Sequence, residues 1–303
     1  MVSRERLHRL ASRVAELASA RRVRLAGHVL LLGGLVFLLV RLRSILHDSN
    51  IHLSNIEWGW LAGAIVLGVV AVIGSSLIWL VILRRLGSPV RWPAAAIYLQ
   101  AQLGKYVPGG VWQYASRGAM ARGYGMSVRV VARSLPIELA GTLSAGAAFA
   151  VLTLGWWGAI AVAAAVAAAV RAGTYFDEER ISLRIAAQVI PLYAATWLLI
   201  GVSFWMTARA FLHVTPSDLA LYTGAFAAAW IVGLLAIYAP GGIGVREAVL
   251  VAILGPHIGS ADALVVAVAS RGVFTVADLI PAALSLPLLR RQTHQSVEPA
   301  PPL

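Results

Sequence analysis

The chain has 303 residues, of which 59% are hydrophobic and only 13% charged, and its mean hydropathy is +0.80. This composition excludes a soluble globular domain and is typical of a polytopic helical membrane protein. The formal net charge of +12 lies between apolar runs and over the N-terminus instead of on one basic face, so we expect no nucleic-acid partner. The absence of cysteine excludes disulfides and thiolate sites.

The first segment, residues 1–24, is predicted to be a basic cytosolic or interfacial N-terminal segment. Its arginines alternate with leucines and a valine at helical spacing, as in a helix that lies on a membrane surface. A positive flank that only orients the following span would give the same pattern. The apolar run 25–40 ends in arginines without a small-residue cleavage site, so we interpret it as an uncleaved first span.

The second predicted span, residues 58–83, fixes the expected orientation. Arg84, Arg85 and Arg91 follow it, whereas the loop that precedes it is poor in arginine. Because positively charged loops stay in the cytosol, the N-terminus and the 84–91 loop are predicted to be cytosolic.

The chain then enters the membrane again from the cytosolic side, and a helix break is predicted at the sequence Lys105-Tyr-Val-Pro-Gly-Gly. Residues 92–106 would make only about 22 Å of helix, which is short of the ~30 Å hydrocarbon core. Proline and paired glycines then interrupt the helix, and arginines return the chain to the cytosol. The sequence therefore predicts a re-entrant hairpin over 92–126, with the helix-break residues Tyr106, Pro108, Gly109 and Gly110.

Three further spans are predicted at 135–154, 156–170 and 185–208, the first two joined by an aromatic turn at the outer interface. The motif then recurs, and its helix-break residues are Tyr238, Pro240, Gly241 and Gly242. Because the last span, 261–289, ends in Arg290 and Arg291 and must finish in the cytosol, the segment 219–256 is predicted to be a second hairpin that enters from outside. Residues 291–303 are predicted to be a disordered cytosolic tail.

The predicted fold is therefore an all-α polytopic membrane protein with about six transmembrane helices and two oppositely oriented re-entrant helical hairpins. Interrupted helices at matching positions in two halves indicate an inverted repeat and a transport site near the midplane of the bilayer. The predicted transmembrane domain covers residues 25–290.

Both breaks carry a resemblance to a known family. Lys105 to Gly110 with Arg117, and Pro-Gly-Gly-Ile-Gly-Val-Arg-Glu at 240–247, resemble the flippase-like membrane domain of bacterial lysyl-phosphatidylglycerol synthases and their stand-alone relatives. The resemblance covers most of residues 25–290 and implies a lipid translocator. The aminoacyl-transferase domain of the bifunctional synthases has no counterpart in this chain, so the resemblance does not imply its chemistry.

Charged residues near the breaks are the candidate site. Helix N-termini and cations suit a phosphate, and ionisable residues within a membrane favour function. We expect Glu247 to pair with Arg271, Glu138 to pair with Arg117 or Lys105, and Asp278 to reach Arg271 through another residue. Structural ion pairs that clamp the broken helices would use the same residues. The candidate substrate-binding residues are Lys105, Arg117, Arg246, Glu247 and Arg271, and the supporting ion-pair residues are Glu138 and Asp278.

The leading hypothesis is a flippase of the plasma membrane for anionic phospholipids or lipid-linked precursors. An accessory scaffold of a lipid- or glycosyl-transferase system and a headgroup transferase are the alternatives. No catalytic constellation, phosphate-binding loop or pair of histidines at ligand spacing is found, so we expect neither an enzyme nor a metal or other cofactor. A homo-oligomer and a separate lipid-modifying enzyme are the protein partners left open.

Overall fold

The computed structural model describes residues 55–88, 93–106, 112–155, 158, 183–235 and 242–295. These residues form eight α-helices and two short 3-10 helices, and no strand. The elements in chain order are α3 (Trp58–Arg85), α4 (Pro93–Ala101), η2 (Gln102–Tyr106), α5 (Trp112–Gly123), α6 (Val128–Leu154), α8 (Leu183–Arg209), η3 (Pro216–Asp218), α9 (Leu219–Leu235), α10 (Val245–Ile258) and α11 (Ser260–Gln295).

Five segments among the described residues are long and apolar enough to cross a membrane. Four of them, in α3, α6, α8 and α11, correspond to predicted spans. The fifth, Pro216–Leu235, is the segment that the sequence analysis assigned to the first arm of the second hairpin. The predicted spans 25–40 and 156–170, and the predicted N-terminal segment, lie outside the described residues. The chain is thus a polytopic helical membrane protein.

Two helix boundaries differ from the predicted ones. α6 begins at Val128, so Arg129 and Arg133 belong to the helix and not to the loop before it. Long arginine side chains can reach the membrane surface from a helix end, so their charge does not require a loop. At the other end of the domain, α11 continues through Arg290 and Arg291 to Gln295, which shortens the predicted tail.

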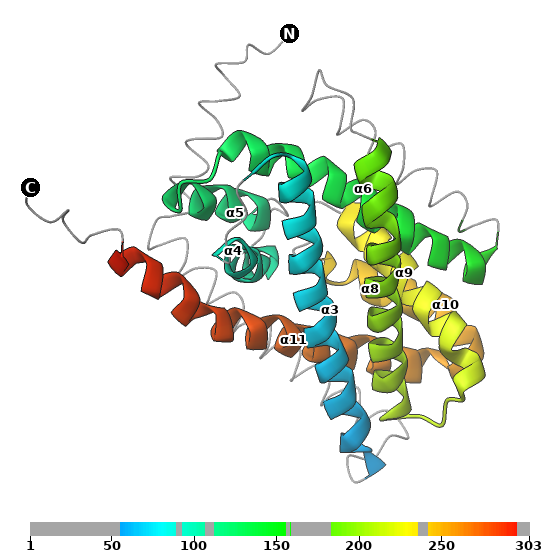
Figure 1. Cartoon of the computed structure of the whole chain (residues 1–303). Coiled ribbons are helices and arrows are strands. Elements are labelled where there is room, and N and C mark those ends of the chain that lie inside the picture. Colours follow the sequence, from blue (N-terminus) through cyan, green and yellow to red (C-terminus); the bar gives the residue numbers. More distant parts are fainter. Residues whose placement is uncertain are drawn as a thin grey trace, which may run out of the picture.

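Small residues allow the long helices to pack closely. α3 and α8 run side by side, and α11 crosses them (Figure 1). A Cβ atom added at Gly68 of α3 would lie 2.8 Å from the Cβ of Ala277 in α11, and one at Gly146 of α6 would lie 2.7 Å from the Trp197 ring of α8. Such contacts are typical of helices that associate in lipid, where van der Waals packing replaces the hydrophobic drive.

Helices lie before and after each of the two Pro-Gly-Gly motifs. α4 and η2 pack against α5, and a Cβ at Gly104 of η2 would lie 2.6 Å from the backbone nitrogen of Gln113 in α5. α9 packs against α10 in the same way. The break residues Pro108, Gly109, Gly110, Tyr238, Pro240 and Gly241 lie outside the described residues. The membrane crossing of each hairpin and the inverted repeat stay predictions.

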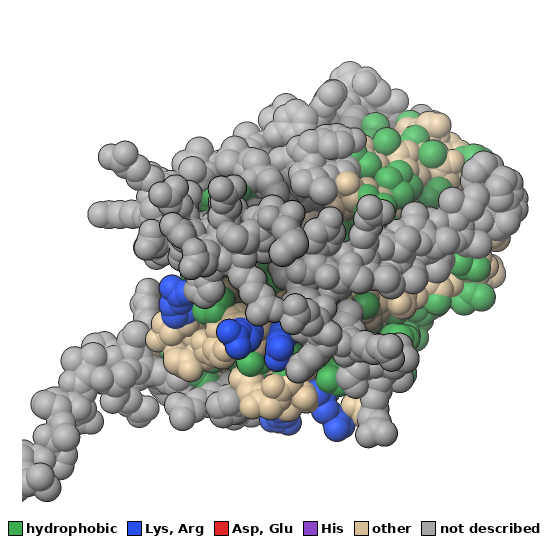
Figure 2. Space-filling model, turned by 90° about the horizontal axis from the view of Figure 1, so that it is seen from above, with side chains coloured by type: hydrophobic (Ala, Val, Ile, Leu, Met, Phe, Trp, Pro, Cys, Tyr) green, Lys and Arg blue, Asp and Glu red, His purple; other side chains and the backbone are tan. Residues whose placement is uncertain are grey.

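Charge is distributed unequally between the two ends of the molecule. Leu83, Ala121 and Leu289 pack in one cluster, which brings together the C-terminal ends of α3 and α11 and the α5–α6 turn. We call this the basic end. Its exposed arginines are Arg84, Arg85, Arg122 and Arg129. Figure 2 looks onto this face and shows Lys and Arg side chains but no acidic side chain on the described surface.

The opposite end carries acidic residues. Glu57, just before α3, pairs with Arg209 at the end of α8 at 2.5 Å, and the Trp60 indole donates to the same carboxylate at 3.0 Å. Asp218 of η3 and Asp262 at the start of α11 also lie at this end. The two ends therefore differ in the sign of their charge.

Candidate functional site

A cavity of about 230 Å³ lies between the long helices and receives residues next to both Pro-Gly-Gly motifs. Lys105 and Tyr106, before the first motif, line it, together with Gly242, Arg246 and Glu247 at the end of the second motif and after it. Most of the remaining wall comes from α3, α6, α8, α9 and α11 and includes Ser75, Thr142, Trp197, Phe226, Trp230, Arg271, Phe274 and Asp278. The two flanks of the Pro-Gly-Gly breaks thus reach one shared cavity.

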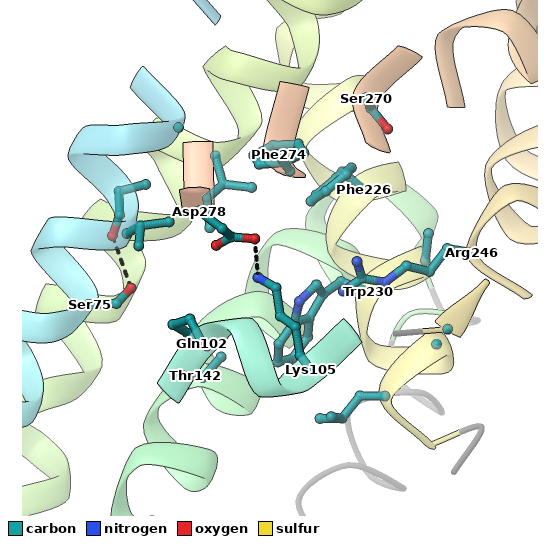
Figure 3. Close-up of a pocket in the computed structure, with 18 of the residues that line it drawn as sticks. Ser75, Gln102, Lys105, Thr142, Phe226, Trp230, Arg246, Ser270, Phe274 and Asp278 are labelled. Carbon is teal, nitrogen blue, oxygen red and sulfur yellow. Dashed lines mark hydrogen bonds and ion pairs between the residues drawn. The ribbon is translucent and has the colours of Figure 1, made fainter. Parts of the chain in front are cut away.

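The 3-10 helix η2 is joined to α11 at Asp278. This carboxylate is only 2% exposed, and it lies 2.6 Å from the Lys105 Nζ and accepts a hydrogen bond from the Tyr106 hydroxyl at 2.5 Å. Figure 3 shows Lys105 pointing to Asp278, with the ion pair between them as a dashed line. The Lys105 side chain is 35% exposed, so one side of this ion pair remains open to the cavity. Asp278 is thus held by Lys105 and Tyr106.

α10 is joined to α11 at Arg271. The Arg271 Nε donates to Glu247 at 2.5 Å, and the two side chains are 15% and 14% exposed. This confirms the pairing that the sequence analysis preferred. Glu247 also accepts a hydrogen bond from the Gly244 backbone N–H at 2.6 Å, where it caps the N-terminus of α10. One carboxylate therefore fixes both the start of α10 and its position on α11.

In the described part of the cavity lining, Arg246 is the cation for which no described carboxylate is a partner. Among the described residues it makes no ion pair or hydrogen bond that would satisfy its Nε, which is buried. Its guanidinium lies 5.7 Å from the Trp230 ring, and Figure 3 shows the side chain extending toward that tryptophan. Its stem passes over Gly233 of α9, where an added Cβ would lie 2.5 Å from the Arg246 Cγ.

Arg117 is placed differently from the other candidate cations. It is 1% exposed and does not belong to the described cavity lining, and its guanidinium pairs with Glu138 of α6. Of the two partners considered for Glu138, the structure therefore shows Arg117. The rings of Trp79, Tyr98 and Tyr114 surround the guanidinium at 4.2–5.7 Å, and the Tyr98 hydroxyl donates to Glu138 at 3.2 Å. This arrangement is that of a buried clamp between α5 and α6.

At the end of the second Pro-Gly-Gly motif, the backbone comes very close to a glycine of α9. Gly242 has a φ of +69°, a region that side-chain-bearing residues rarely adopt. A Cβ at Gly242 would also lie 2.9 Å from the Cα of Gly233. The backbone after the break is thus pressed against α9 at the residue over which Arg246 passes.

The sequence analysis did not identify several residues of the cavity wall. Trp230, Gly233 and Phe226 of α9, and Tyr98 of α4, contact the charged groups or line the cavity, but in the sequence they are indistinguishable from packing residues. Gln100 of α4 also was not identified, and it donates its amide to the Ala282 carbonyl and lies 3.1 Å from the Ser285 hydroxyl in α11. No group of three or more potential metal ligands is present among the described residues.

Comparison of the sequence with protein-family models and with curated proteins finds no match.

Proposed function

We propose that this membrane protein translocates lipids with anionic headgroups through the central cavity. The observation that carries the proposal is the convergence of charged residues from both hairpins on one cavity, inside a bundle whose long helices are apolar enough to span a bilayer. Ionisable residues within a membrane are expensive to bury and are typical of substrate pathways. A headgroup would occupy the cavity while its acyl chains remain in lipid.

The ion pairs to α11 provide a way for binding to change the shape of the cavity. Lys105–Asp278 and Glu247–Arg271 each join one hairpin to the same helix, at positions seven residues or about 10 Å apart along it. The negative charge of a headgroup would attract the same cations as Asp278 and Glu247, and would so loosen one connection without displacing either carboxylate. The segment on that side could then move and change which leaflet the cavity faces.

This function agrees with the resemblance of the two breaks to the flippase-like membrane domain of lysyl-phosphatidylglycerol synthases, and we propose that the chain is a stand-alone member of that family in the plasma membrane. By the positive-inside rule, we expect its basic end and both termini to lie in the cytosol. Because no nucleotide-binding motif was found in the sequence, lipid movement would follow a gradient or be coupled to an ion.

The test is lipid scrambling by the full chain in reconstituted vesicles. Fluorescent anionic, zwitterionic and polyprenyl-phosphate lipids are added in trace amounts, and a membrane-impermeant quencher reports the fraction in the outer leaflet over time. We expect the protein to accelerate the exchange of at least the anionic phospholipid over protein-free vesicles. No acceleration of any of these lipids would contradict the proposal.

A matched pair of variants separates transport from a scaffolding role. Arg271→Gln removes a cation of the cavity, whereas Arg84→Gln removes an exposed one at the end of α3. We expect the rate of lipid exchange to fall roughly tenfold or more in Arg271→Gln and to stay unchanged in Arg84→Gln. A fall of roughly this size corresponds to the loss of one charge-assisted hydrogen bond. Thermal unfolding in detergent verifies that both variants fold. Equal rates in the two folded variants would favour a scaffold.

A further inference from the structure

We infer that the cavity selects a lipid headgroup that carries a single negative charge, a phosphodiester, and that Arg246 is the residue that binds it. This inference rests on the proposed function and adds to it the charge class of the substrate. Its two supports are the number of charges in the site and the surroundings of Arg246.

The charges of the site leave one cation unpaired. The described part of the chain places four cations and three carboxylates at the cavity and its clamp, which gives a net charge of +1. Lys105, Arg117 and Arg271 each have a carboxylate within ion-pair distance, and these partners are Asp278, Glu138 and Glu247. Arg246, the fourth cation, has no carboxylate within ion-pair distance among the described residues. One bound negative charge would therefore neutralise the site without breaking an existing pair.

Arg246 is positioned to receive that charge. Its stem is fixed over Gly233, its Nε is buried without a hydrogen-bond partner among the described residues, and Trp230 lies beside the guanidinium. A planar guanidinium can donate two parallel hydrogen bonds to a phosphate, which makes it a better partner for this group than an ammonium. The ligand would thus satisfy a polar group that the protein leaves unsatisfied.

The net charge of +1 disfavours headgroups that carry two negative charges or that are zwitterionic. A phosphomonoester carries about −1.5 to −2 at neutral pH, so its second charge would have to displace Asp278 or Glu247 from its partner. The ammonium of a zwitterionic headgroup would need a carboxylate, but all three carboxylates of the described site are already paired. A buried carboxylate that loses its partner is costly, because its desolvation is no longer offset. The volume of about 230 Å³ also suits a headgroup alone, with the acyl chains outside it.

The test compares fluorescent phosphatidylglycerol, phosphatidic acid and phosphatidylcholine in vesicles that contain the full chain. We expect phosphatidylglycerol, the phosphodiester with one net charge, to exchange several-fold faster than the other two. Arg246→Gln should reduce that exchange roughly tenfold or more, Arg246→Lys should retain part of it, and the exposed control Arg84→Gln should retain the wild-type rate. Thermal unfolding in detergent verifies that the variants are folded.

The outcomes separate the inference from the proposed function. If wild-type protein accelerates lipid exchange but phosphatidic acid moves as fast as phosphatidylglycerol, or if folded Arg246→Gln keeps the wild-type rate, the inference is wrong and the function stands. If no lipid is accelerated, both are wrong.

A further experiment loads vesicles with the water-soluble glycerophosphoglycerol. Its protein-dependent release at the rate of the lipid would assign the site to a soluble phosphodiester and overturn the lipid assignment.

Discussion

The charged residues inside this protein differ in what they contact, and this difference separates structural from functional roles. Arg117 has a carboxylate on one side, aromatic rings around it and almost no exposed surface. Arg246 has an aromatic neighbour but no carboxylate partner in the described part of the chain. A cation with a satisfied partner holds helices together, whereas one without a partner is available to a ligand.

The clamp between Arg117 and Glu138 gives a prediction about stability. Glu138→Gln would leave the buried guanidinium without a counter-charge, and removal of one partner of a buried pair costs about 3–5 kcal/mol. We therefore expect a large fall in the free energy of unfolding, measured by denaturation in detergent micelles. The matched control is Glu57→Gln, whose carboxylate is 46% exposed and pairs with Arg209 at the protein surface. There the loss should be no more than about 1 kcal/mol.

A double variant verifies the cause of this loss. Replacement of a whole buried pair by apolar residues is often neutral, because no charge is left uncompensated. Arg117→Met with Glu138→Leu should therefore be more stable than Glu138→Gln alone. If the double variant is as unstable as the single one, packing of the side chains, and not the missing counter-charge, is responsible.

At the scale of the elements, the apolar runs were sufficient to predict α3, α8 and α11, because twenty or more apolar residues have few alternatives to a membrane-spanning helix. Arg129 and Arg133 misled the prediction of where α6 begins, since arginine is compatible with both a loop and a helix end near the membrane surface. The pairing of Glu247 with Arg271, and Arg117 as one of two candidate partners of Glu138, could be predicted because the charged residues of the spans are few. The Lys105–Asp278 pair was not predicted, because Lys105 was considered only as a partner of Glu138. The surroundings of Arg246 could not be predicted, because Trp230 and Gly233 are ordinary residues of an apolar helix in the sequence.

The close contact between Gly242 and Gly233 of α9 gives a prediction about stability. Gly242→Ala would place a Cβ 2.9 Å from the backbone of Gly233, at a residue whose φ is +69°. Gly259, after α10, also has a positive φ, +88°, but nothing lies within 4 Å of its Cβ position. Gly259→Ala should cost about 1–2 kcal/mol from backbone strain alone, and Gly242→Ala should cost clearly more.

The measurement for both glycine variants is the midpoint of thermal unfolding in the same detergent. Equal losses of stability would mean that the backbone after the break can move away from α9 without cost. The fixed position of Arg246 over Gly233 would then not depend on that contact.

For the whole molecule, the distribution of charge predicts its orientation. The six acidic residues in the described part of the chain divide between the cavity (Glu138, Glu247 and Asp278) and the end opposite the basic one (Glu57, Asp218 and Asp262). The basic end has exposed arginines, whereas the three carboxylates of the cavity are paired with cations. Since arginine-rich loops are retained in the cytosol, the basic end should face it.

The absence of cysteine makes this orientation directly measurable, because a single introduced thiol has no competitor in the chain. Ser127 lies exposed between α5 and α6 at the basic end, and Ser217 lies exposed in η3 at the opposite end. In intact cells that express the full chain, a membrane-impermeant maleimide should label Ser217→Cys and should label Ser127→Cys only after the membrane is permeabilised. The reverse pattern would invert the predicted orientation. Labelling of both variants in intact cells would mean that the two ends are not on opposite sides of the membrane, and a cavity between them could not then connect the two leaflets.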